Sequence, residues 1–159
     1  MNRTSLILLI IGVSLALLTA CSKRDKVVKG VGDDDPEMVA AIAKARSTLP
    51  RFWQAFEKRD RGEANFSLKI KITDKTRIEH FWLTDIERQD GKVMGTINNA
   101  PNIVANVKRG DRLEIPEAKI QDWSYMRGGK MIGNETIKPM LKMMRAGDAA
   151  QLRTFFEDP

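Results

Sequence analysis

The stretch of residues 108–138, KRGDRLEIPEAKIQDWSYMRGGKMIGNETIK, decides the fold because it alternates turn residues and apolar residues more densely than the rest of the chain. Pro116 ends a first short strand, since proline cannot donate a hydrogen bond to a strand ladder. Gly128-Gly129 is typical of a tight hairpin turn. The predicted strands are residues 113–115, a strand that carries Ile120, Trp123 and Tyr125, and residues 130–133. The stretch therefore predicts short antiparallel strands.

Upstream of this stretch, apolar residues recur at every second position, which is the pattern of half-buried strands. Residues 66–73 form the first such run. Residues 77–87 form a second, and because both of its faces are partly apolar we expect it to lie centrally in a sheet. Asp90-Gly91 is a strong hairpin signal that leads into a third strand. Val104 and Val107 then support either a short helix or a packed loop.

Before the strands, the apolar residues follow the 3.6-residue period of a helix that buries one face. Asp35 is a typical N-cap residue, and Pro36 suits the first helical position, where its missing donor is not needed. Pro50 predicts either a kink or two abutting helices. The apolar stripe continues in phase through Pro50, which favours a kink. The stripe consists of Met38, Ile42, Ala45, Leu49, Phe52, Trp53 and Phe56.

The C-terminal part returns to a helical period. Thr136 is a predicted N-cap, Gly147 is expected to end that helix, and Asp148 with Gln151 resembles a capping box for a terminal helix. The order helix, antiparallel strands, helix predicts an α+β fold. We expect an N-terminal kinked amphipathic helix packed on an antiparallel, strongly bent sheet of about five short strands, with one or two C-terminal helices.

The first residues read as an export signal rather than as part of the fold. Arg3 supplies the positive start, and residues 6–18 form an apolar core that is too short for a comfortable bilayer span. Residues 18–21, LTAC, resemble the bacterial lipobox, which implies a thioether-linked diacylglycerol on Cys21 and acylation of its freed amine. The alternative is an ordinary signal with an incidental cysteine. Ser22 is compatible with delivery to the outer membrane of a two-membrane host, facing the periplasm, rather than with retention in the inner membrane.

The predicted organisation follows from these segments. Residues 1–20 are a lipoprotein signal peptide. Residues 21–35 are a flexible tether, because their polar and charged composition cannot bury enough apolar surface to offset the entropy of ordering. Residues 36–146 form a single α+β domain, and residues 147–159 form a C-terminal helical extension.

The net charge and the cysteine count narrow the classes of function. The formal net charge is +6, and the loss of Arg3 with the signal leaves +5 on about 139 residues, enough for one domain. A basic surface is typical of nucleic-acid binding, but an exported, anchored protein meets little nucleic acid, so we expect no such partner. The charge suits anionic lipid headgroups or an anionic envelope polymer, with a merely solvated face as the alternative. Cys21 is the only cysteine, which rules out an internal disulfide.

His80 is the only histidine and hence the only ready acid–base group near neutral pH. Asp85, Asp122 and Ser124 are its candidate partners in a hydrolytic triad, but their spacing does not require proximity. A histidine that is hydrogen-bonded in or beside the core is favoured, so we predict no catalytic residue. One histidine and a lipidated cysteine cannot assemble a zinc site, and we expect no metal and no cofactor. Residues 127–130 lack the full pattern of a phosphate loop and are interpreted as a hairpin turn.

The strongest candidate for a binding surface is residues 122–125, DWSY. Alternation places Trp123 and Tyr125 on one face of the strand near Arg127, and aromatic residues with arginine are the types that interfaces favour. Core packing of both aromatic side chains is the alternative, and it is favoured. The candidate ligand or partner surface comprises His80, Trp82, Asp122, Trp123, Tyr125 and Arg127.

Motifs along most of the domain resemble the YegJ-type family, small bacterial lipoproteins that carry a domain of unknown function. The matching motifs are residues 43–46, 49–50, 52–53, 79–83, 95–99, 101, 110–111, 114–116, 122–123, 125–126, 133–134 and 136–139. The resemblance covers nearly all of residues 36–145 and implies an envelope location without supplying an activity, and residues 146–159 stand outside it as an addition.

Three functions stay open. The first is a lipid-anchored binding or accessory module that faces the periplasm and recognises an envelope protein or polymer through its sheet. The second is a small envelope inhibitor or immunity-like protein. The third is a hydrolase that uses His80 with a carboxylate.

Overall fold

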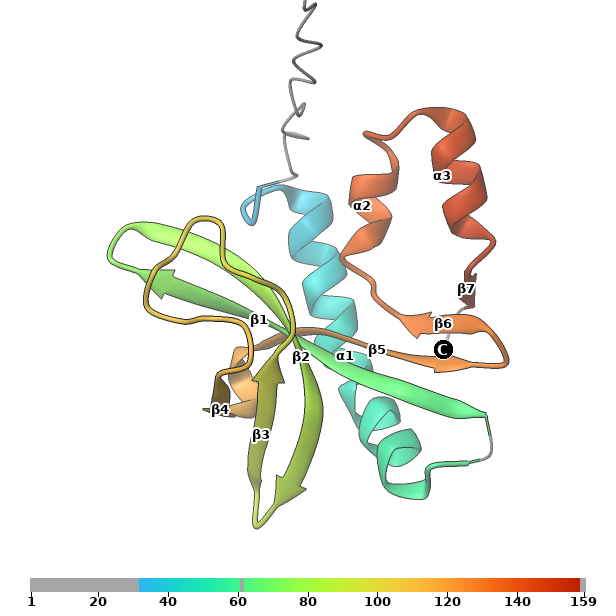
Figure 1. Ribbon diagram of the computed structural model, residues 1–159. Coiled ribbons are helices and arrows are strands. Elements are labelled where there is room, and N and C mark those ends of the chain that lie inside the picture. Colours follow the sequence, from blue (N-terminus) through green and yellow to red (C-terminus); the bar gives the residue numbers. More distant parts are fainter. Residues whose placement is uncertain (1–31, 61, 158–159) are drawn as a thin grey trace, which may run out of the picture.

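The computed structural model describes residues 32–60 and 62–157, so the predicted signal peptide, Cys21 and most of the predicted tether lie outside the described residues. Within them, helix α1 packs on a seven-stranded sheet of order β4-β3-β2-β1-β5-β6-β7, which confirms the α+β class (Figure 1). The elements are α1 (Pro36–Lys58), β1 (Glu63–Asp74), β2 (Arg77–Gln89), β3 (Lys92–Ile97), β4 (Arg112–Ile115), the 3-10 helix η1 (Glu117–Lys119), β5 (Ile120–Arg127), β6 (Lys130–Gly133), α2 (Ile137–Leu141), α3 (Ala146–Arg153) and β7 (Phe156–Glu157).

Helix α1 begins where the sequence predicts. The Asp35 side chain accepts hydrogen bonds from the backbone N–H groups of Glu37 and Met38, which caps the first turn. The helix continues through Pro50 without a break, so the alternative of two abutting helices is wrong. The predicted stripe is buried at Met38, Ala45, Leu49, Phe52, Trp53 and Phe56.

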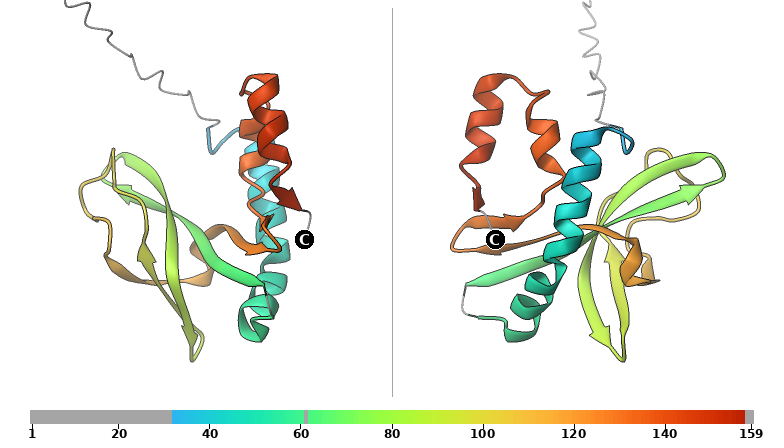
Figure 2. Two further views of the ribbon diagram at one scale, coloured as in Figure 1. Left: turned by 45° about the vertical axis from the view of Figure 1, so that its right-hand side comes forward. Right: turned by 180° about the vertical axis from the view of Figure 1, so that it is seen from behind.

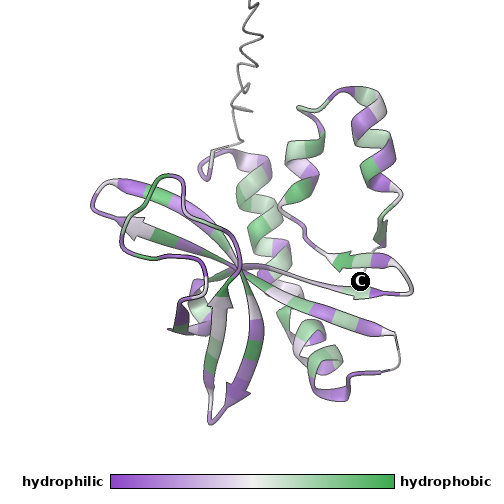
Figure 3. Cartoon of the chain, viewed as in Figure 1, coloured by the Kyte–Doolittle hydropathy of each residue, from purple (hydrophilic) through white to green (hydrophobic). Residues whose placement is uncertain are grey.

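The long hairpin of β1 and β2 carries the core on one face and polar side chains on the other. Leu68 lies opposite Leu83, and Ile70 lies opposite Phe81; all four side chains are buried. The intervening positions, such as Lys69, face the other side, and Figure 3 shows this alternation along both strands. The prediction that the second strand lies centrally is confirmed, because β2 lies between β1 and β3.

The prediction of about five short strands is wrong in number and in length. The sheet has seven strands, and β1 and β2 contain 12 and 13 residues. Most pairs are antiparallel, but the two-residue strand β7 pairs in parallel with β6. Strand β7 follows α3 within the segment for which the sequence predicts only helix. A strand of two residues has no period that a sequence pattern can display.

The segment between β3 and β4 is a packed loop, and the alternative of a short helix is wrong. Glu79 of β2 is buried, and its carboxylate accepts hydrogen bonds from the backbone N–H groups of residues 102–104 at 2.8–3.1 Å. Burial acts to raise the pKa of Glu79, but these hydrogen bonds outweigh it and hold the pKa below its usual value. One carboxylate thus fixes the loop on the sheet.

The C-terminal helices depart from the sequence prediction in their boundaries. Thr136 precedes α2, but its side chain makes no capping hydrogen bond and donates to Asp122 instead. Helix α2 ends before Gly147, and Gly147 lies inside α3 rather than at the end of a helix. Asp148 lies in the first turn of α3 and pairs with Arg145 instead of forming a capping box.

Gly133 allows β6 to approach Trp123 closely. Its φ is +83°, and a Cβ atom at this position would lie 2.5 Å from the Trp123 carbonyl oxygen and 2.6 Å from the Trp123 ring. Both the backbone conformation and the space therefore require glycine.

We predict that Gly133→Ala lowers the free energy of unfolding by about 2–4 kcal/mol, because the strain of a positive φ adds to the overlap with Trp123. Gly129→Ala is the matched control: its φ is +79°, but nothing lies within 4 Å of the added Cβ. The control should lose only about 1 kcal/mol. Urea unfolding measures both values, and equal losses would contradict the role of close packing.

Candidate functional site

The predicted binding surface divides into buried and accessible side chains. Asp122, Trp123 and Tyr125 are 0, 1 and 6 % exposed. The Trp123 ring stacks on Tyr125 with centroids 6.1 Å apart, and its Nε1 donates to the Ala45 carbonyl in α1 at 2.8 Å. A partner cannot reach Asp122 or Trp123 without opening the core, and only a small part of Tyr125 is accessible, so core packing describes all three. Arg127 is accessible and pairs with Glu157.

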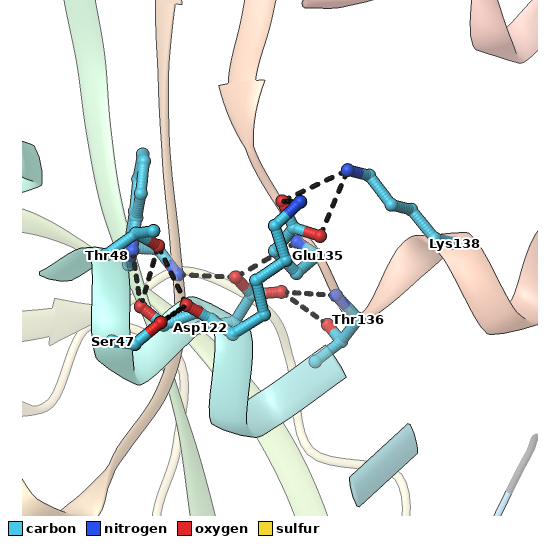
Figure 4. Close-up of polar contacts among 9 residues, drawn as sticks. Ser47, Thr48, Asp122, Glu135, Thr136 and Lys138 are labelled. Carbon is cyan, nitrogen blue, oxygen red and sulfur yellow. Dashed lines mark hydrogen bonds and ion pairs between the residues drawn. The ribbon is translucent and has the colours of Figure 1, made fainter. Parts of the chain in front are cut away.

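The Asp122 carboxylate joins β5 to the segment before α2 (Figure 4). It accepts hydrogen bonds from the backbone N–H groups of Trp123, Glu135 and Thr136 at 2.8, 3.2 and 2.8 Å. The Thr136 hydroxyl donates a fourth at 2.6 Å. Burial raises the pKa of Asp122, whereas the hydrogen bonds and the charge of Lys69 act against this rise. Because all four partners donate, the carboxylate serves as an acceptor in a structural joint.

A polar cluster lies on the outer face of β1 and β2, next to this joint. Lys69 Nζ donates to Thr136 Oγ1 at 2.9 Å. His80 Nε2 lies 3.1 Å from one oxygen of Asp33, and Lys71 Nζ lies 3.0 Å from the other. Burial lowers the pKa of Lys69, although nearby carboxylates act to raise it. Burial also lowers the pKa of His80, against the effect of Asp33. The cluster ties the start of the described chain to the sheet.

The triad considered for His80 is not assembled within the described residues. His80 contacts Asp33 and has a side-chain hydrogen bond with Gln121 that acts to raise its pKa. The Asp122 oxygens instead accept hydrogen bonds from the residues of the joint described above. Ser124 lies opposite Ser67 on the other side of β1. Among the described residues, no three His, Cys, Asp or Glu side chains gather as metal ligands would.

Trp82 is half-buried and belongs to the same polar face as His80. The Lys69 ammonium lies 5.9 Å from the centroid of the Trp82 ring, and the Asn99 side chain accepts a hydrogen bond from the Trp82 backbone at 3.0 Å. Of the six predicted surface residues, His80, Trp82 and Arg127 are therefore accessible. Arg127 lies on a different part of the sheet, so the structure does not bring the six together.

A cleft opens where the sheet divides. Strands β1 and β2 pair only as far as Leu68 opposite Leu83; beyond that point β1 follows β5 and β2 follows β3. Figures 1 and 2 show the two strands diverging on either side of the last turns of α1. The cavity between them has a volume of about 600 Å³. We call it the strand cleft; its lining includes Phe56, Phe66, Ile86, Asn65, Asp85 and Asn98.

Both strands are irregular at the strand cleft. The register of β1 against β5 shifts around Asn65, and that of β2 against β3 shifts around Asp85. The φ angles of Asn65 and Asp85 are +55° and +49°, in the left-handed region that asparagine and aspartate tolerate better than most residues. Bulges of this kind bend a strand away from its neighbour and occur frequently beside functional sites. They open the cleft here.

The charged groups of the strand cleft are one guanidinium and two carboxylates, from Arg59, Glu63 and Asp85. The Arg59 guanidinium lies 4.6 Å from the centroid of the Phe56 ring. The Glu63 side chain is 7 % exposed, and its Oε2 has no hydrogen-bond partner among the described residues. Glu63 also borders a second hollow of about 290 Å³ that includes Tyr125 and Arg127.

Sequence reasoning missed the strand cleft, although one signal for it exists. The period of two predicts a core-facing Asp85 and an exposed Ile86, but Asp85 is exposed and Ile86 is buried. In an alternating strand, a polar residue where an apolar one is due, followed directly by an apolar residue where a polar one is due, indicates a bulge. The extra residue of the bulge shifts the alternation by one position. The bulge at Asn65 in β1 gives no such signal, because Phe66 stays in phase with Leu68 and Ile70.

Comparisons with known proteins cover most of the chain. The family model described as "Uncharacterized protein conserved in bacteria (DUF2314)" matches residues 35–155, so most of the segment that the sequence analysis set apart as an addition lies within it. The uncharacterized protein YegJ of Escherichia coli K12 is 40 % identical over 129 residues, which are 81 % of this chain and 82 % of YegJ. A Neisseria meningitidis serogroup B protein that bears the name ankyrin repeat protein is 29 % identical over 128 residues, 76 % of this chain and 51 % of that protein.

No solved structure matches the chain. Among the described residues, no helix combines the length and the apolar composition needed to cross a membrane.

We predict that His80 makes stability depend on pH. The pKa of His80 is lowered in the folded protein, so as the pH falls below about 7 the unfolded chain takes up a proton first and stability falls. His80→Gln should flatten the loss between about pH 7 and pH 5. Asp33→Asn should steepen it, because Asp33 acts to raise this pKa. Urea unfolding across this range measures the slopes, and identical slopes in the wild type and His80→Gln would contradict the assignment.

Proposed function

The chain belongs to the DUF2314 family of uncharacterised proteins conserved in bacteria, and we propose that it is a lipid-anchored binding or accessory module of the cell envelope. The anchor is the lipid on Cys21, and the domain faces the periplasm from the outer membrane. The strand cleft is the binding site. The single observation that carries the binding role is the division of the sheet between two bulged strands.

The lipobox-like sequence LTAC at residues 18–21 supports the anchor. Several acyl chains on one cysteine would hold the domain permanently, since a single chain binds membranes only marginally. Helix α1 begins at Pro36, so a short segment rich in charged residues lies between Cys21 and the domain. This arrangement suits a module that works close to the membrane surface.

The geometry of the strand cleft supports an extended peptide segment of an envelope protein as its ligand. Past Leu68 and Leu83, β1 and β2 no longer pair with each other, so each presents a backbone edge toward the cleft. An added strand gains main-chain hydrogen bonds from such an edge, and side-chain pockets then give specificity. Phe56, Phe66 and Ile86 supply an apolar wall for alternate side chains of the peptide.

The charges in the strand cleft favour a peptide over an anionic polymer. Asp85 is exposed, whereas the Glu63 side chain is nearly buried and its Oε1 lies 3.8 Å from the Arg127 guanidinium. The cleft therefore offers one accessible carboxylate beside the Arg59 guanidinium, and not the excess of positive charge that attracts a polyanion. A peptide can place a cationic side chain near Asp85 and still use the backbone edges.

We predict that metabolic labelling with a fatty acid marks the full-length protein and that Cys21→Ser abolishes the label. Thioether formation requires the sulfur of Cys21, which is the only cysteine in the chain. Ser22→Ala is the matched control and should keep the label. Persistent labelling of Cys21→Ser would refute the anchor.

We predict that a photo-crosslinking amino acid at Ala64 or Asn98, two exposed positions that line the strand cleft, captures a specific envelope protein in living cells. The control position is Gln89, which is exposed at the far end of β2. Mass spectrometry of the crosslinked species identifies the partner. Capture of a lytic enzyme whose activity falls on binding would make the module an inhibitor. Crosslinks no different from those at Gln89 would contradict binding in the cleft.

A further inference from the structure

The loop between α2 and α3, residues 142–145 with the sequence KMMR, exposes two adjacent methionines between two basic residues. Met143 is 52 % exposed and Met144 is 37 % exposed. Val39 in the first turns of α1 is 51 % exposed. These are three of the six large hydrophobic side chains that the described part of the chain exposes, and all three belong to its helical layer. We call this loop with Val39 the KMMR end.

The KMMR end lies where the described chain begins. Figures 1 and 2 show the start of α1 and the α2–α3 loop at the same end of the molecule in each view. An ion pair between Lys142 and Glu37 joins the two directly. Ten residues lie between Cys21 and Gly32, and the eleven Cα–Cα steps from one to the other span at most about 40 Å. A lipid on Cys21 would therefore keep this end within about 40 Å of the bilayer.

The charges of the KMMR end complement an anionic membrane. The side chains of Lys142 and Arg145 are 64 and 88 % exposed, and their ion pairs with Glu37 and Asp148 are too exposed to hold them firmly. The segment of residues 22–31 adds four basic residues against one acidic residue. Basic residues next to an anchor are attracted to anionic headgroups, and methionines between them can enter the interface while the charged heads stay in water.

We infer that the KMMR end docks on the membrane surface, with Met143 and Met144 in the interface and Lys142 and Arg145 at anionic headgroups. The inference rests on the proposed lipid anchor. It also gives the domain an orientation. Helix α1 runs for 23 residues, about 35 Å, from this end to the strand cleft at Phe56 and Arg59. Docking would hold the cleft away from the bilayer, open to a partner in the periplasm.

Depth measurements on the full-length lipidated protein in vesicles of phosphatidylethanolamine and phosphatidylglycerol test the inference. The lipid blocks the sulfur of Cys21, so Met143→Cys introduces one reactive thiol for an environment-sensitive fluorophore. Gln89→Cys is the matched control, because it is exposed in the β2–β3 hairpin, which Figure 1 shows at the opposite end. Doxyl groups on the lipid chains quench a fluorophore that enters the interface.

We expect a blue-shifted emission and severalfold stronger quenching at position 143 than at position 89. Lys142→Glu with Arg145→Glu should reduce the quenching at position 143. Equal quenching at both positions would overturn the docking, and so would a blue shift without quenching, since a protein rather than lipid would then cover the loop. Failure of the proposed anchor can be told apart from failure of the docking. Without the anchor, mass spectrometry would show no lipid on the protein, and the protein would not insert into the vesicles.

Discussion

The buried Asp122 carboxylate is the constraint on which the rest of the structure depends. A buried charge that loses its partner costs on the order of 3–5 kcal/mol, so its donors must stay in place. Those donors come from β5 itself and from residues 135–136 before α2. The adjacent Trp123 then fixes β5 to α1 through the Ala45 carbonyl, and Gly133 leaves the space that β6 needs beside the indole. Three segments far apart in the chain are held in one arrangement.

Glu79 is a second buried carboxylate that accepts several backbone hydrogen bonds, as Asp122 does. Its carboxylate binds three consecutive backbone N–H groups and holds the β3–β4 loop without a regular strand ladder. Near these two joints β1 and β2 stay paired, and past Leu68 and Leu83 they diverge. The strand cleft is thus an opening at the end of a well-fixed scaffold, which is the usual setting for recognition. The polar residues that suggest a catalytic interpretation belong to the scaffold, and the proposed binding site lies where the regular pairing of β1 and β2 ends.

The sequence predicts those features whose causes are local. Asp35 caps α1 through residues two and three positions away, and Asp90-Gly91 and Gly128-Gly129 form the hairpins they indicate, each with positive φ angles. The sequence does not predict non-local contacts. Asp122 bonds to Thr136, 14 residues away, and Trp123 bonds to Ala45, 78 residues away, and neither spacing indicates a contact. The burial of Trp123 and Tyr125 agrees with the favoured interpretation of both as core. The sequence does not predict the contacts of Asp122, and the Thr136 hydroxyl donates to Asp122 instead of forming the predicted cap. The bulge at Asp85 interrupts the period of two predicted over residues 77–87, and the bulge at Asn65 lies just before the predicted strand 66–73.

Hydrogen exchange on the full-length protein tests most directly whether the strand cleft recognises a partner through its free strand edges. In the purified protein, the amides of residues 65–67 and 84–86 should exchange faster than those of residues 68–70 and 81–83, where β1 and β2 pair. In envelope membranes that contain the partner, exchange at 65–67 and 84–86 should slow, while the paired residues keep their rates. Unchanged exchange at the cleft edges in the membranes, with protection elsewhere on the sheet, would contradict this account.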